Sequence, residues 1–63
     1  MTMLEYFKMI LQKVSFDLTL FAKEFLKAAG KLPEEEMSEL RIWCLQVFGL
    51  HYCREAVPEF DRG

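Results

Sequence analysis

Apolar residues recur at intervals of three and four along the first part of the chain. Over residues 3–14 they form a single stripe, and the charged and amide side chains fall outside it. This spacing gathers the apolar side chains on one face of a helix, so we predict an amphipathic helix over residues 3–14. The stripe consists of Met3, Leu4, Phe7, Ile10, Leu11 and Val14.

A break is predicted at residues 15–17, before a second helix. Asp17 is a good N-cap residue, because its carboxylate can accept hydrogen bonds from the free N–H groups of a first helical turn. Phe16 and Phe21 flank this cap at the spacing of a hydrophobic staple. No glycine or proline enforces the break, however, and the apolar spacing continues in phase through it. A single helix over residues 3–29, paired with the third helix in a hairpin dimer, is therefore the alternative.

The start of a third helix is marked by Pro33. Proline suits the first position of a helix, and the acidic side chains of residues 34–36 suit the positive end of the helix dipole. Gly30 is placed to end the second helix in the left-handed conformation that glycine adopts without strain. We therefore predict that the second helix ends at Gly30, that the third begins at Pro33, and that Gly49 ends the third.

These elements predict an all-α fold, a three-helix unit (helix–turn–helix–turn–helix), with the option of a short fourth helix within residues 50–57. Pro58 cannot continue a helix, so we expect a single helical domain over residues 1–57 and a flexible C-terminal tail over residues 58–63. The apolar stripes of the helices should form the core. Its central residues are expected to be Phe7, Leu11, Phe21, Phe25, Leu40, Trp43 and Val47.

The chain carries more large apolar residues than so small a core can hold. Of its 63 residues, 27 are Val, Ile, Leu, Met, Phe, Tyr or Trp. The core has room for about half of them, because each buried side chain needs roughly six to twelve neighbours. The surplus predicts an interface, and a two-fold homodimer is its simplest closed form. The residues assigned to this interface are Met9, Leu20, Ile42 and Leu45.

Charge is unevenly divided between the two halves of the chain. Residues 1–31 hold five lysines and three acidic residues, whereas residues 32–63 hold three arginines and seven acidic residues. Opposite charges of this kind favour packing of the two halves, within one chain or between chains. Because the net charge is −2 and the lysines are scattered, a nucleic-acid-associated regulator using the lysines of helices one and two is only an alternative function.

Cys44, His51 and Cys53 are the only group of soft metal ligands in the chain. Zinc sites usually take four ligands in close pairs, and residues two apart on a helix face away from each other, so a thiol- or metal-responsive module is a second alternative. We expect no cofactor and no enzyme activity, because the single histidine has no evident catalytic partners and the chain has little room for a cleft. Cys44 should be buried and inert, and Cys53 exposed and reactive.

The function favoured by the sequence is a small helical protein–protein interaction module, a homodimeric adaptor or regulator that acts through an apolar groove. No apolar run has the length of a membrane span, and no small-molecule substrate is indicated. Two cysteines cannot form a dense disulfide framework, and the N-terminal region has no basic export signal. A cytoplasmic location is therefore expected.

Overall fold

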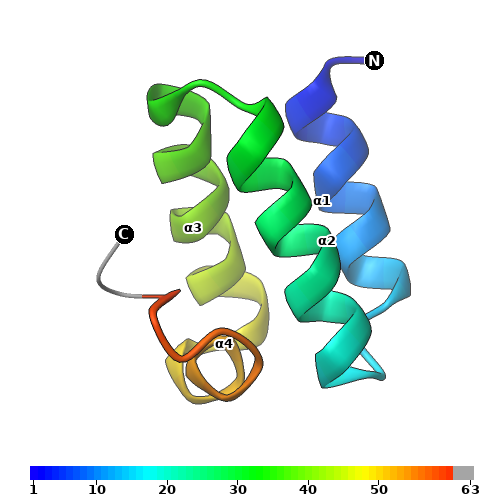
Figure 1. The fold of residues 1–63 in the computed structure, drawn as a ribbon, viewed down its shortest axis with the longest axis vertical. Coiled ribbons are helices and arrows are strands. Elements are labelled where there is room, and N and C mark those ends of the chain that lie inside the picture. Colours follow the sequence, from blue (N-terminus) through cyan, green and yellow to red (C-terminus); the bar gives the residue numbers. More distant parts are fainter. Residues whose placement is uncertain (61–63) are drawn as a thin grey trace.

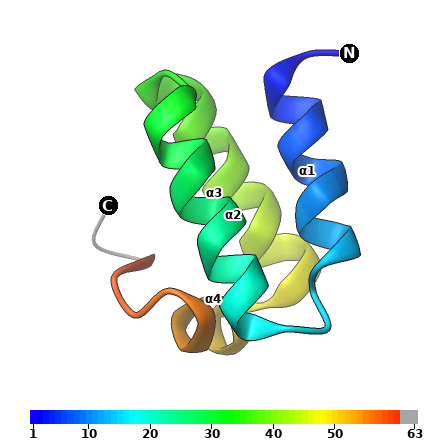
Figure 2. The ribbon, with the colours of Figure 1, turned by 45° about the vertical axis from the view of Figure 1, so that its right-hand side comes forward.

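Four helices follow one another in the computed structural model, which describes residues 1–60. Helices α1, α2 and α3 run up and down the molecule side by side, and α4 crosses at one end, viewed almost along its axis in Figure 1. Figure 2 shows α4 beneath the lower ends of α2 and α3. The predicted all-α fold is confirmed, and the optional fourth helix is present. The helices span Met3–Lys13 (α1), Leu18–Lys31 (α2), Glu34–Phe48 (α3) and Leu50–Ala56 (α4).

The first two helices are separate, and each begins at a capped residue. Thr2 and Glu5 form a capping box on α1, in which the Thr2 hydroxyl accepts from the Glu5 N–H at 3.1 Å and the Glu5 carboxylate accepts from the Thr2 N–H at 3.4 Å. The Asp17 carboxylate accepts from the N–H groups of Thr19 and Leu20 at 2.9 and 3.2 Å, as predicted. The single helix over residues 3–29 is therefore not formed. Phe16 is 80% exposed and does not supply the predicted staple.

The junction between α2 and α3 differs from the prediction by one or two residues. Helix α2 continues through Gly30 to Lys31, and Leu32 turns the chain in an extended conformation while its N–H donates to the Ala28 carbonyl at 2.8 Å. Burial of the Leu32 side chain favours this exit, so no left-handed residue is needed at Gly30. Pro33 is the N-cap rather than the first residue of α3.

Gly49 is where the chain uses the conformational freedom of glycine. It lies between α3 and α4 with φ 89° and ψ 154°, a region of backbone space that is essentially restricted to glycine. Because of this turn, α4 leaves the direction of α3 and packs across the ends of α2 and α3.

The core lies between the four helices and is mostly the one expected. Trp43 is only partly buried against it, and Val47 is 49% exposed, so the assignment of Val47 to the core was wrong. The covered face of α3 follows Met37, Leu40 and Cys44 instead, because the apolar stripe of α3 is wider than the neighbouring helices can cover. The buried residues are Leu4, Phe7, Leu11, Phe21, Phe25, Ala28, Leu32, Met37, Leu40, Cys44, Cys53, Ala56, Val57 and Phe60.

The chain beyond α4 contributes to this core. Val57 and Phe60 are both buried, and the Phe60 ring lies 5.2 Å from that of Phe25. Phe60 therefore packs on the helices although it follows the predicted domain boundary at residue 57. The flexibility expected of residues 58–63 stays a prediction, and residues 61–63 lie outside the described part of the chain. Within residues 1–60, no helix has the length and apolar character needed to cross a membrane.

Candidate functional site

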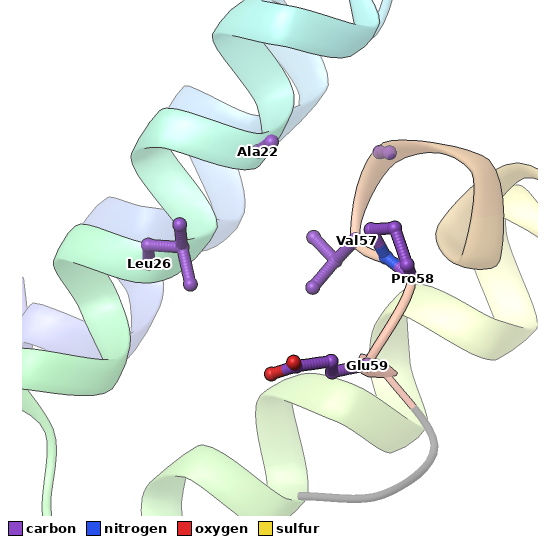
Figure 3. A pocket seen from close by; sticks show the side chains of 6 residues that line it. Ala22, Leu26, Val57, Pro58 and Glu59 are labelled. Carbon is purple, nitrogen blue, oxygen red and sulfur yellow. The ribbon is translucent and has the colours of Figure 1, made fainter.

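An apolar hollow of about 240 Å³ lies between α2 and the segment that follows α4. Ala22 and Leu26 line it from α2, and the other wall is Ala56 and residues 57–59. In Figure 3 the side chains of Leu26 and Val57 point toward one another across this space, and Glu59 points into it from the same wall as Val57. The hollow is thus built by two segments that are at least 30 residues apart in the sequence.

Pro58 and Phe60 explain why the second wall stands away from α2. A proline cannot donate in a helix and restricts the residue before it, so Val57 leaves α4 in an extended conformation with φ −129° and ψ 95°. The Phe60 N–H then donates to the Val57 carbonyl at 2.8 Å, and the Phe60 ring is anchored beside Phe25. This tight turn leaves Pro58 and Glu59 exposed at the rim.

A second hollow, of about 160 Å³, continues this space toward α3. It shares Leu26, Val57 and Glu59 with the first hollow and adds Met37 and Arg41 to the lining. We call the two hollows together the groove. Its lining is mainly apolar, and Glu59 and Arg41 are its charged members.

The four residues predicted as an interface are all exposed on the folded chain: Met9, Leu20, Ile42 and Leu45. Ile42 and Leu45 lie on α3, three residues apart and thus neighbours on one face, whereas Met9 is on α1 and Leu20 on α2. None of them lines the groove. Their role in an interface stays a prediction.

Sequence reasoning missed Leu26 and the Val57–Glu59 wall. Leu26 is 62% exposed on α2, and the wall was assigned to the end of the domain and to the tail. The one local signal of the wall is the order Val-Pro-Glu-Phe, in which a helix-ending proline stands between two apolar residues. That order allows the chain to turn back, but it does not show that the Phe60 ring packs on Phe25.

The two cysteines lie in the core, on α3 and α4. Both side chains are fully buried, which confirms the prediction for Cys44 and shows that the exposure predicted for Cys53 was wrong. Cys53 is covered because the side of α4 that carries it packs against α2 and α3. Burial raises the pKa of the Cys44 thiol to about 12; the nearby Cys53 adds to the increase and the Lys8 ammonium opposes it. Burial likewise raises the pKa of Cys53, so both thiols are protonated at neutral pH and are poor nucleophiles.

His51 is separated from both thiols. Its side chain is 91% exposed and its Nε2 lies 3.2 Å from the Glu55 carboxylate, one turn further along α4. Cys44, His51 and Cys53 are therefore not gathered at one point. Among residues 1–60, no group of three or more Cys, His, Asp or Glu side chains is placed to hold a metal ion.

Comparisons with protein-family models, curated proteins and solved structures find no match for this chain.

Proposed function

We propose that this chain is a small helical protein–protein interaction module, a homodimeric adaptor or regulator that works by binding rather than by catalysis. The observation that supports this proposal most directly is the apolar groove beside Leu26. Grooves of this kind accept the apolar side chains of a partner, and helical segments are frequent occupants.

The size and lining of the groove favour a protein partner over a small substrate. Sites for small ligands commonly enclose roughly 300–1,000 Å³ and place several polar groups toward the ligand. Each hollow of the groove lies below that range, at about 240 and 160 Å³, and the charged lining residues of the groove are Glu59 and Arg41. One or two apolar side chains of a partner fit such a space better than an enclosed substrate does.

Exposed apolar side chains support self-association. Single exposed apolar residues are ordinary on a folded protein. A small domain, however, buries a limited fraction of its surface by itself, so burial of more apolar surface against a second copy adds to its stability. Among the described residues, the large apolar side chains that are more than a third exposed are Met1, Met3, Tyr6, Met9, Phe16, Leu18, Leu20, Leu26, Ile42, Leu45, Val47 and Leu50.

We place this function in the cytoplasm as part of the same proposal. Cys44 and Cys53 are both free thiols, the state that a reducing compartment maintains.

Sedimentation equilibrium over a wide range of protein concentrations tests the proposal. We expect a mass that rises from one chain to two with concentration. A parent protein that stays a folded monomer at high micromolar concentration would contradict the homodimer. Binding to DNA that weakens steeply with salt would instead favour the nucleic-acid alternative through the lysines of α1 and α2.

A further inference from the structure

We infer that the groove is filled by a second copy of this chain, in a two-fold dimer in which Leu26 of each protomer enters the groove of the other and Lys23 of each protomer faces Glu59 of the other. This inference rests on the proposed function, since it names the partner and the surface of the proposed interaction module. It places the interface at the groove, in place of the surface that the sequence suggested at Met9, Leu20, Ile42 and Leu45.

The shape of the surface is self-complementary around Leu26. The Leu26 side chain lines both hollows and points toward Val57 (Figure 3), yet it is 62% exposed, so one face of the molecule carries both an exposed apolar side chain and a space of matching character. A two-fold interface needs both on the same patch, because each surface meets its own copy. The neighbouring α2 positions are small: Ala22 and Ala29 line the hollows, and a Cβ atom added at Gly30 would meet open space. A second backbone can therefore approach α2 closely.

Charge is complementary across the same patch. Lys23 lies one turn before Leu26 on the exposed side of α2, and Glu59 lies on the opposite wall of the groove. Within residues 1–60, neither side chain has an ion-pair partner within 4.0 Å. If the two-fold axis runs along the groove, α2 of one copy lies over the Val57–Glu59 wall of the other copy. Each dimer then contains two equivalent Lys23–Glu59 pairs.

The division of charge along the sequence agrees with this arrangement. The lysines belong mostly to the first half and the acidic residues to the second half. The Lys27–Glu24 ion pair and the His51–Glu55 contact nevertheless lie within single helices, α2 and α4. Lys23 of one chain can therefore pair with Glu59 of another, which joins the basic half of one chain to the acidic half of the other.

Leu26→Glu and Ile42→Glu form a matched pair of variants. The two side chains are similarly exposed, at 62% and 57%, and both lie inside helices, but only Leu26 lines the groove. We expect Leu26→Glu to weaken dimerisation by about 30-fold or more, as central apolar residues of interfaces do, and Ile42→Glu to leave it nearly unchanged. Far-UV circular dichroism checks that both variants keep their helices.

A charge exchange between the two walls tests the two-fold geometry without changing the apolar contact. Lys23→Glu alone and Glu59→Lys alone each place like charges at both edges of a homodimer, so each should dimerise several-fold more weakly at low salt. An equimolar mixture of these two variants restores opposite charges at both edges. We expect the mixture to form a heterodimer at least as stable as the parent dimer.

The outcomes separate this inference from the proposed function. A parent dimer that withstands Leu26→Glu but dissociates with Ile42→Glu overturns the groove interface and leaves the interaction module standing, with its interface on the outer face of α3. A mixture of the charge variants that dimerises no better than either variant alone also overturns it. A parent that is monomeric at every concentration overturns this inference and the proposed homodimer together.

Discussion

The hydroxyl of Tyr52 on α4 donates a hydrogen bond to the backbone carbonyl of Ser15, in the turn between α1 and α2. The Tyr52 ring also packs edge-on against Phe21 and stacks on Phe48, at centroid distances of 5.1 and 5.6 Å. One side chain thus joins α4 to three other parts of the fold. The position of α4 determines where the Val57–Glu59 wall stands, so this contact also supports the groove.

We predict that Tyr52→Phe lowers the free energy of unfolding by about 1 kcal/mol. The substitution keeps the ring and removes the hydroxyl, which leaves a partly buried carbonyl without its donor. Tyr52→Ala should destabilise the protein further, because it also removes the contacts with Phe21 and Phe48. Chemical denaturation of the three proteins at one concentration measures both steps. Equal stability of the parent and Tyr52→Phe would show that the hydroxyl bond contributes nothing.

Replacement of two glycines by alanine should change stability in opposite directions. Gly30 lies inside α2 with helical backbone angles, and a Cβ there meets open space, so Gly30→Ala should stabilise the fold by about 0.5–1 kcal/mol. Gly49 has φ 89°, so Gly49→Ala should destabilise it by about 1–3 kcal/mol. Thermal or denaturant unfolding at a fixed protein concentration compares the two. A stabilising Gly49→Ala would mean that the turn between α3 and α4 is different from the one described.

Phe60 should behave as a core residue although it lies beyond the last helix. It is 2% exposed and packs on Phe25, so Phe60→Ala should cost about 3–5 kcal/mol, enough to unfold much of so small a domain. Phe16→Ala is the matched control, since Phe16 is 80% exposed and its removal should change stability by less than about 0.5 kcal/mol. Similar melting of the two variants would place Phe60 outside the core.

Alkaline pH should destabilise the fold through its buried thiols. The ordinary pKa of a cysteine is 9.0, and burial first of all raises that of Cys44 to about 12. The folded chain therefore keeps this proton after the unfolded chain has lost it. Below pH 9 this thiol leaves the free energy of unfolding unchanged, because it is protonated in both states. As the pH rises from 9 toward 12, the free energy of unfolding falls by about 1.4 kcal/mol per pH unit for this one thiol. The raised pKa values of Cys53 and Tyr52 act in the same direction.

Denaturant unfolding between about pH 9 and pH 11 measures this slope, and Cys44→Ala should make it shallower whatever the variant does to stability at neutral pH. Thiol reagents give an independent readout. Both cysteines should react slowly in the folded protein and rapidly once it is unfolded, because both are buried and protonated. Fast labelling of Cys53 alone in the folded protein would contradict the packing of α4.

Local chemistry allowed the sequence by itself to determine the helices of this protein and much of its core. Asp17 caps α2, Pro33 separates α2 from α3, and the spacing of Phe7, Leu11 and Phe21 places these residues inside. Each of these signals acts within one or two helical turns, through a hydrogen bond to the nearest N–H groups, a fixed φ angle or a helical repeat. No distant partner has to be known to interpret them.

Only the tertiary structure decided which of several apolar positions are covered. Val47 is exposed and Cys53 is buried because the neighbours of α3 and the turn at Gly49 determine which faces are packed. The groove depends on Phe60 meeting Phe25, two residues that are 35 positions apart in the chain. Burial free energy depends on the side chains that come together in space, and a local window of sequence contains only one of the two partners.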